Sequence, residues 1–253
     1  MIQLINLTKV YSKVKAIDNI NLEVKKGEIF GFLGPNGAGK TTTIKIMVGL
    51  LKPTSGRVII DGNDIIINPI EVKKVVGFIP DRPFLYEKLT GKEFLRFMAG
   101  LYSINTNSYE SKISELLELF ELTEWRNELI EGYSHGMQQR LVMSAALIHN
   151  PKVIIVDEPM VGLDPKGARL VKEIFKTISS QGTTIFMSTH SLEIAEEMCN
   201  RIAIIQEGKV IASGTMDELR NKVDNSKNQR LESLFLALTG GEEMRGIIEV
   251  LKW

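Results

Sequence analysis

The chain has 253 residues, of which 43% are hydrophobic and 25% are charged, so its composition is that of an ordinary globular domain with a sizeable core. Its 31 Lys and Arg residues balance 31 Asp and Glu residues, whereas a protein that neutralises nucleic-acid phosphates usually carries a basic excess, and we therefore expect no nucleic-acid partner. No apolar run approaches the roughly 20 residues that span a bilayer, and the single cysteine, Cys199, excludes an internal disulfide and a cysteine-based metal site.

The N-terminal part alternates apolar and polar residues over 2–11 and 16–28, which predicts two half-buried strands. Because this start does not resemble a secretory leader, we expect the chain in the cytoplasm, where any membrane role must come through a partner. A short apolar strand at 28–34 runs into a glycine-rich loop. Residues 40–51 then show helical periodicity, and the sequence Pro-Thr-Ser-Gly predicts the end of that helix.

Two further strands are predicted at 57–62 and 75–80, before the pattern changes. Residues 81–150 contain three helical patterns and no strand candidate, whereas strands and helices alternate again from 151 onward. This alternation predicts an α/β fold with a mostly parallel sheet, an antiparallel β edge at the N-terminus and an inserted all-helical sub-domain. We expect three parts: an α/β core over 1–80 and 151–221, a helical sub-domain over 81–150, and a C-terminal linker with a short helical tail over 222–253.

A phosphate-binding loop is predicted between the strand at 28–34 and the helix that follows it. The segment GPNGAGKTT fits G-x-x-x-x-G-K-[ST] in the strand–loop–helix context that this motif requires, so a chance glycine-rich turn is the weaker interpretation. Glycines let backbone N–H groups face a phosphate, and the helix N-terminus adds positive potential. Lys40 can reach the β- and γ-phosphates of ATP, and the Thr41 hydroxyl suits Mg²⁺. The expected core is thus a phosphate-loop NTPase, with ATP bound by Gly34, Pro35, Asn36, Gly37, Ala38, Gly39, Lys40, Thr41 and Thr42.

An apolar strand at 153–157 ends in two adjacent carboxylates, Asp157 and Glu158. Acidic side chains beside buried β-branched residues are costly unless a cation or a reacting group compensates them. Asp157 suits Mg²⁺, which prefers oxygen ligands, and Glu158 suits a general base that accepts a proton from the attacking water. Strand-ending acids can also simply cap a turn, but the phosphate loop upstream favours the catalytic interpretation.

The segment YSHGMQQR, residues 133–140, narrows the choice among phosphate-loop ATPases. It lies just before a predicted helix and ahead of the acidic strand, and it resembles the signature of ABC ATPases, usually LSGGQ. Two of its residues match the family pattern, Ser134 and Gly136, and three depart from it, Tyr133, His135 and Met137. The form S-x-G-M is similar to that of ABC subunits in drug- and polysaccharide-export systems. The resemblance extends from about residue 2 to residue 220.

The resemblance implies roles for single residues outside these motifs. Tyr11 stands where the family stacks an aromatic ring on adenine, although it could be an ordinary strand-end tyrosine. His190 matches the switch histidine near the γ-phosphate, with a structural histidine as the alternative. Asp164 matches a loop that crosses the dimer interface. Asp81 replaces the usual glutamine, and its carboxylate could face the nucleotide, the attacking water or Mg²⁺. His149 is predicted to be structural, and the role of His135 stays open.

The resemblance also implies the assembly. ABC ATPases bind two ATP molecules between two subunits, so we expect a homodimer or heterodimer in which Ser134 and Gly136 complete the partner's site. A separate transmembrane permease would hold the pair at the inner face of the cell membrane. The run Phe84, Leu85 and Tyr86 could touch that permease or could be core packing. The tail LESLFLALTGG resembles that of export-class subunits, although an importer's subunit would share every catalytic motif.

Other functions fit the sequence less well. ABC ATPases that act on DNA need a long coiled-coil insertion, and those that act on ribosomes carry two cassettes in one chain. A phosphate-loop kinase or GTPase would lack both the signature and the late histidine. A non-hydrolysing regulatory binder requires Glu158 to be misplaced. The sequence does not name the cargo or the direction of its transport.

Overall fold

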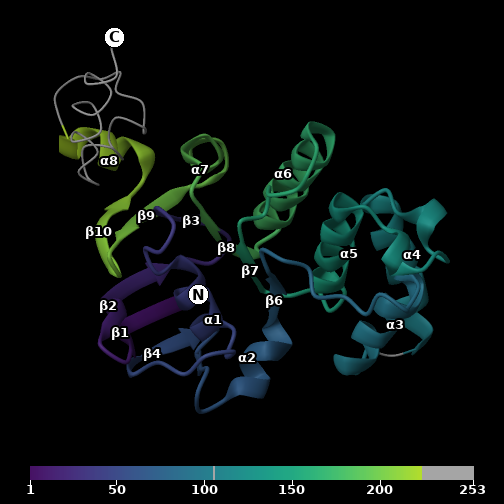
Figure 1. Cartoon of the computed structure of the whole chain (residues 1–253), viewed down its shortest axis with the longest axis horizontal. Helices are drawn as coiled ribbons and strands as arrows, with labels where there is room; N and C mark the ends of the chain where they lie inside the picture. The colour runs from purple at the N-terminus through teal and green to yellow at the C-terminus, as the bar shows by residue number, and fades with distance from the viewer. Residues whose placement is uncertain (105, 224–253) are drawn as a thin grey trace, which may run out of the picture.

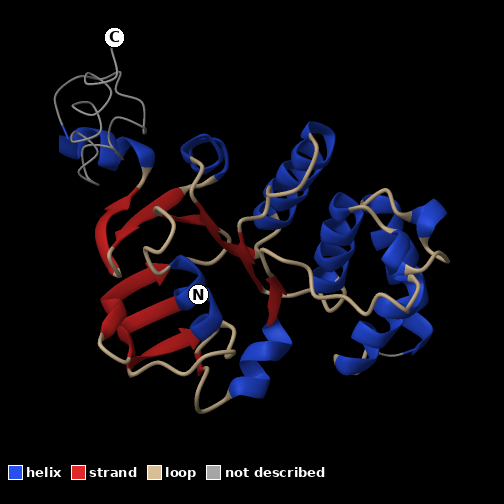
Figure 2. Ribbon diagram, viewed as in Figure 1, coloured by secondary structure: helices blue, strands red, loops and turns tan. Residues whose placement is uncertain are grey.

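The computed structural model describes residues 1–104 and 106–223, and of the side chains in this part it leaves out those of 106–108 and 222–223. The predicted C-terminal helix at 231–238, and nearly all of the predicted linker before it, lie outside the described residues. Figure 1 gives the arrangement of the elements in chain colours, and Figure 2 separates strands from helices.

The larger of two sheets has the strand order β10-β9-β3-β8-β7-β6. The strands β3, β6, β7, β8 and β9 are parallel, and only β10 runs antiparallel, against β9. Each parallel strand has an apolar centre of the kind that sheets buried on both faces require. The bounds are β3 Ile29–Leu33, β6 Val76–Ile79, β7 Val153–Asp157, β8 Thr184–Thr189, β9 Arg201–Gln206 and β10 Lys209–Gly214.

The smaller sheet is antiparallel, with the order β2-β1-β4-β5. Its strands are β1 Ile2–Tyr11, β2 Val14–Val24, β4 Ser55–Ile60 and β5 Asn63–Asp64. Helix α1, Lys40–Met47, packs with it against one face of the larger sheet, as Figure 1 shows around the N-terminus. The α/β fold with a mostly parallel sheet and an antiparallel N-terminal part is thus confirmed.

Two separate apolar cores cover the two faces of the larger sheet. Alternate residues of one strand point to opposite faces, so in β7 Ile155 packs with the smaller sheet and α1, whereas Ile154 and Val156 pack with the helices of the other face. The same division holds in β8 between Phe186 and Ile185. The central strands are therefore completely enclosed.

The remaining helices are α2 Pro69–Val75, α3 Gly91–Leu101, α4 Thr106–Leu119, α5 His135–Leu147, α6 Pro165–Ser180, α7 Leu192–Met198 and α8 Met216–Val223, with 3₁₀ turns at Thr123–Trp125 and Ile130–Gly132. Helices α3, α4 and α5 lie together, beside the sheets, on the right of Figures 1 and 2. The segment that holds them, without residue 105, contains no strand, as the sequence predicts, and the boundaries at 81 and 150 stay a prediction. Within the described ranges, no helix has the length and hydropathy to cross a membrane.

Several elements differ from the sequence prediction: α2, α8 and β5 were not predicted, and α1 is shorter than expected. Helix α1 ends at Met47 instead of residue 51, because the chain turns at Gly49, with φ of 73°, and the Lys45 carbonyl accepts hydrogen bonds from the N–H groups of both Leu50 and Leu51. Helix α2 was not predicted. It is short and has only one buried residue, Val72, so it leaves no apolar periodicity in the sequence.

Candidate functional site

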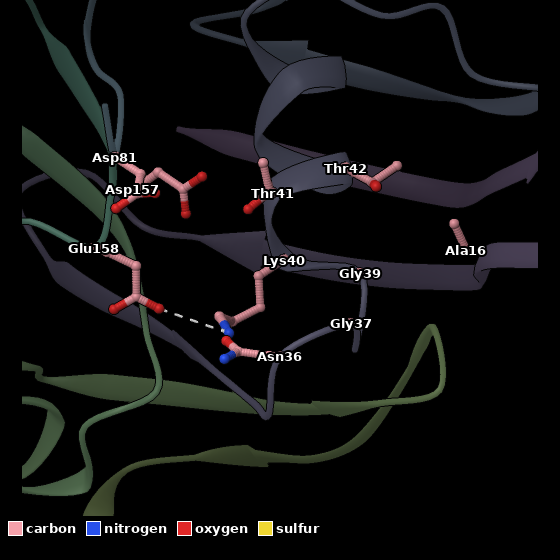
Figure 3. Close-up of a pocket in the computed structure, with 10 residues that line it drawn as sticks. All are labelled: Ala16, Asn36, Gly37, Gly39, Lys40, Thr41, Thr42, Asp81, Asp157 and Glu158. Atoms are coloured by element: carbon pink, nitrogen blue, oxygen red, sulfur yellow. Dashed lines mark ion pairs between the residues drawn. The ribbon is translucent and has the colours of Figure 1, made fainter. Parts of the chain in front are cut away.

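A polar pocket lies where the phosphate loop meets the carboxyl ends of β6 and β7 (Figure 3). In open parallel sheets, ligands bind in the crevice beyond these strand ends. The pocket encloses about 220 Å³ and is lined by Ala16, Asn36, Gly37, Gly39, Lys40, Thr41, Thr42, Asp81, Asp157 and Glu158. The fold thus brings together three separate segments of the chain, which are the phosphate loop, the acidic end of β7 and Asp81.

The tight turn of the phosphate loop depends on glycine at position 39. Gly39 precedes α1 with φ of 110°, a conformation that residues with a Cβ rarely adopt, and an added Cβ would lie 2.5 Å from the carbonyl oxygen of Ala16. This close approach of β2 to the loop explains why Ala16 lines the pocket. No pattern of residue types indicates Ala16, because its approach to Gly39 is made through its carbonyl oxygen.

Lys40 is the cation of the pocket. Its side chain is 6% exposed, and its ammonium donates hydrogen bonds to the carbonyl oxygens of Gly34 at 2.7 Å and Pro35 at 3.3 Å. Its Nζ also lies 3.7 Å from Oε1 of Glu158, and Figure 3 shows the two side chains pointing toward one another. A buried ammonium needs compensating partners, and here the loop carbonyls and one carboxylate provide them at the place where a phosphate would bind.

The two acids after β7 have different surroundings. Asp157 is buried, and its Oδ1 accepts a hydrogen bond from the Ser188 hydroxyl of β8. Glu158 has φ of 53°, an uncommon conformation for a residue with a side chain, and its N–H donates to the carbonyl and hydroxyl oxygens of Ser188 at 3.3 and 3.2 Å. Nδ1 of His190 lies 3.0 Å from Oε1 of Glu158. One carboxylate oxygen therefore faces both Lys40 and His190.

The oxygen atoms of the pocket fit Mg²⁺. Thr41, Asp81 and Asp157 all line it, and this cation prefers one or two carboxylates together with phosphates and water to a complete protein cage. Among the described residues, no group of three or more His, Cys, Asp or Glu side chains is arranged to hold a metal ion by itself. A metal here would be held jointly by the protein and by a bound phosphate.

Several predicted residues lie outside the pocket lining. Ser134 caps α5, where its hydroxyl oxygen accepts a hydrogen bond from the N–H of Met137 at 3.3 Å, and neither Ser134 nor Gly136 reaches this pocket. Tyr11 is 46% exposed at the end of β1, beneath the ammonium of Lys9, and does not line the pocket either. Ala38 is buried beneath the loop.

Tyr133, which stands where the usual signature has leucine, has a structural explanation. The ring is buried, and its hydroxyl donates to the Trp125 carbonyl oxygen at 2.7 Å. A Cβ at position 91 would overlap the Tyr133 hydroxyl, so the tyrosine fits only because this position holds Gly91. Tyrosine thus replaces leucine here by using the space left by a glycine in α3.

Residues 17–161, more than half of the chain, match a family model described as ABC transporter. The chain belongs to the ABC transporter family. Among similar curated proteins is the linearmycin resistance ATP-binding protein LnrL of Bacillus subtilis (strain 168), which is 38% identical over 223 residues, covering 88% of this chain and 72% of LnrL.

Solved structures agree with this membership. A structure described as the ATP binding subunit of an ABC transporter has a TM-score of 0.89 and 32% identity to this ABC subunit, over 94% of this chain and 99% of that one. A dimeric, post-hydrolysis structure of the ATP-binding cassette MJ0796 with ADP and Pi has a TM-score of 0.77 and 29% identity, over 85% of this chain and 99% of that one. This chain is therefore an ATP-binding subunit with an ABC-type ATPase fold.

Proposed function

We propose that this ABC subunit hydrolyses ATP with Glu158 as the general base and His190 as its positioning partner. The observation that carries this proposal is the Glu158 carboxylate, which lines the phosphate pocket and whose Oε1 lies 3.7 Å from the Lys40 ammonium and 3.0 Å from Nδ1 of His190. A water hydrogen-bonded to this carboxylate would lie close to the place where the phosphate loop would hold a γ-phosphate. Among the described residues that line the pocket, Lys40 and Glu158 form the one ion pair.

In this mechanism the attacking water forms a bond to the γ-phosphorus while the bond to the bridging oxygen of ADP breaks. Glu158 accepts the proton of the water, and Lys40 neutralises charge on the phosphate oxygens. Mg²⁺, when bound by Thr41, Asp157 and Asp81, supplies further charge neutralisation. His190 holds the Glu158 carboxylate in place. The products are ADP and inorganic phosphate.

Two copies are proposed to form the complete site. The pocket of about 220 Å³ is smaller than the roughly 300–1,000 Å³ of most small-molecule sites, so much of a nucleotide would lie outside the walls that one chain supplies. Ser134 lies at the N-terminus of α5, a position that favours an anion, but away from this pocket. A head-to-tail pair would bring Ser134 and Gly136 of one copy to the phosphates of the other. Such pairing is symmetric and closed in a homodimer, and a heterodimer is the alternative.

A separate membrane permease is the proposed third component, which would place the pair at the cytoplasmic face of the membrane. Phe84 and Tyr86 are 83% and 52% exposed, and the Tyr86 ring lies 5.4 Å from that of Phe97. Tyr86 also lies 6.5 Å from Phe84, measured between the ring centroids. Clustered, exposed aromatic rings of this kind suit contact with a partner protein. The similarity to LnrL, a linearmycin resistance protein, supports export as the direction of transport.

The test of catalysis is the ATPase rate of Glu158→Gln against the wild type. We expect a loss on the order of 10²–10⁴-fold, because the amide cannot accept the proton, together with an ATP-bound dimer detected by size-exclusion chromatography with light scattering. Glu193→Gln, on the exposed first turn of α7, is the matched control and should keep the wild-type rate. Equal rates for Glu158→Gln and the wild type would remove Glu158 from the mechanism.

The test of docking is co-purification with the permease. The double variant Phe84→Asp/Tyr86→Asp should lose the permease while its ATPase rate in isolation is kept, since neither ring lines the pocket. Val14→Asp, which replaces a similarly exposed side chain on β2, should keep the permease. Retention of the permease by the double variant would contradict the proposed surface.

A further inference from the structure

The first turn of α5 packs directly against the loop that follows Glu158. The His135 ring lies over Gly162 so closely that a Cβ at position 162 would overlap Cδ2 and Nε2 of the imidazole. Gly162 has φ of 79°, and a Cβ at Gly136 would lie 3.5 Å from the Gly162 carbonyl oxygen. Residue 162 must therefore be glycine for two reasons, its conformation and the ring above it.

A second set of contacts connects α5 with the first turn of α6, through Glu121. The Glu121 carboxylate lies 2.7 Å from Nζ of Lys166 in the first turn of α6, and its other oxygen lies 3.4 Å from Nη1 of Arg140 in α5. Arg140 in turn donates from Nε to the Gly136 carbonyl oxygen at 3.4 Å. The Lys166 and Glu121 side chains are exposed, so we assign the bridge little free energy. It connects α5 with α6, the helix into which the loop runs.

The loop itself is short and closed by hydrogen bonds. The N–H of Val161 donates to the Glu158 carbonyl oxygen at 3.2 Å, and the N–H of Leu163 donates to the Met160 carbonyl oxygen at 3.4 Å. The Asp164 side chain then caps α6 by accepting the Gly167 N–H at 2.9 Å. Because Gly162 lies only four residues after Glu158 in this closed turn, a displacement at Gly162 changes the backbone that sets the Glu158 carboxylate.

We propose that His135 is a positioning residue for Glu158, whose imidazole presses on Gly162 and so holds the catalytic carboxylate in its hydrolytic orientation. A glycine at position 135 has no side chain to make this contact. The inference rests on the proposed function of Glu158, and it gives a role to one of the residues in which this chain departs from the usual signature. His135 is exposed and lies at the first position of α5, so its ring is not needed for the core.

The experiment compares His135→Gly and His135→Phe with the wild type in steady-state ATPase assays. For His135→Gly we expect kcat to fall about 10-fold while KM for ATP stays within about twofold, since a small misplacement of a catalytic group lowers the rate without removing substrate contacts. His135→Phe keeps a flat ring over Gly162 and should recover most of kcat. Asp217→Gly, an exposed first-turn position in α8, controls for a glycine placed at the start of a helix and should keep the wild-type rate.

Two further measurements separate positioning from a merely structural role. In the Glu158→Gln background, His135→Gly should cause no further loss of kcat, because the histidine acts through the missing carboxylate. Amide hydrogen exchange over 158–164 should be faster in His135→Gly than in the wild type, with the melting temperature nearly unchanged. If His135→Gly unfolds, His135→Ala replaces it in every assay.

The possible outcomes are distinguishable. If Glu158→Gln is slow and His135→Gly has the wild-type kcat, the positioning role is wrong and the proposed function stands. A higher KM with unchanged kcat, or a second loss that adds to that of Glu158→Gln, would instead put the imidazole in nucleotide binding and overturn the inference. A wild-type rate for Glu158→Gln would reject the proposed function before the inference is reached.

Discussion

At the scale of single residues, two glycines of the phosphate loop have positive φ but different surroundings. Gly39 has φ of 110° and the Ala16 carbonyl oxygen close behind it, whereas Gly37 has φ of 81° and no atom within 4 Å of an added Cβ. Alanine at either position meets backbone strain, of about 1–3 kcal/mol. Only at position 39 does it also collide with β2.

This difference predicts unequal effects of two matched variants. Gly37→Ala should lower the free energy of unfolding by about 1–2 kcal/mol, the usual cost of the left-handed conformation, and should still bind ATP. Gly39→Ala should lower it further and should lose measurable ATP binding, because the loop and β2 must separate. Urea unfolding and calorimetric titration with ATP check both values. Equal losses in the two variants would contradict the role of the Ala16 contact.

How far the sequence predicted the site also depends on the kind of contact. Lys40, Asp157 and Glu158 were found because their chemistry leaves a pattern of residue types at fixed spacing. Ala16 was missed because only its backbone contributes. Tyr11 and Ser134 were predicted from family resemblance, and the isolated chain leaves both outside the pocket, since their predicted roles require a nucleotide or a second copy.

At the scale of elements, His149 lies where three of them meet. Its ring stacks on Tyr102 at the end of α3, with ring centroids 3.7 Å apart, and its Nε2 lies 3.1 Å from the carbonyl oxygen of Val76, the first residue of β6. His149 itself follows α5. Burial lowers the pKa of this imidazole to about 4, from an ordinary value of 6.5. The ring is therefore neutral in the folded protein at neutral pH, and its structural role, predicted from the sequence, agrees with this packing.

The lowered pKa predicts how stability changes with pH. The unfolded chain takes up a proton on His149 near pH 6.5 and the folded chain only near pH 4, so the contribution of this residue is complete above pH 6.5 and is lost as the pH falls toward 4. Between pH 7.5 and pH 5 we expect a loss on the order of 1–2 kcal/mol in the free energy of unfolding. Urea unfolding at both values tests this, with His149→Phe, which keeps the stack but cannot titrate, as the control. An identical pH dependence in that variant would contradict the assignment.

The elements that the sequence predicted are those with a strong apolar period. The buried strands β3, β7 and β8 are continuous apolar runs, and the amphipathic helices α3 and α6 repeat apolar residues at helical spacing. The missed helix α2 has neither property, and the end of α1 was misplaced because a local turn at Gly49 overrides the apolar residues beyond it. A local turn therefore set the end of α1, and the burial of a single residue hid α2 from the apolar pattern.

At the scale of the whole molecule, the phosphate loop and Ser134 of one chain are proposed to serve two different ATP sites of the dimer. This division allows a complementation test. Lys40→Ala damages the pocket of its own chain, and Ser134→Arg damages the site that it would complete in the partner. Each variant alone should be inactive. A mixed pair contains one site with an intact Lys40 and an intact Ser134, so mixing the two purified proteins should raise the ATPase rate about tenfold or more above either alone.

The control for this test mixes Lys40→Ala with Glu158→Gln. Both substitutions damage the pocket of their own chain, so each site of the mixed pair lacks a residue and the mixture should stay inactive. Recovery in the control, or failure to recover in the Lys40→Ala and Ser134→Arg mixture, would contradict a site shared between two copies.

The enclosure of the central strands between two apolar cores has a consequence for ligand affinity. Amides of β3, β7 and β8 should exchange with solvent only when the whole protein unfolds, because no smaller opening exposes them. The sheet beneath the phosphate loop is therefore already rigid when a nucleotide binds, and ordering this sheet costs little of the binding free energy. Affinity differences between subunits that share this loop should accordingly arise in the segments that close over the ligand from outside.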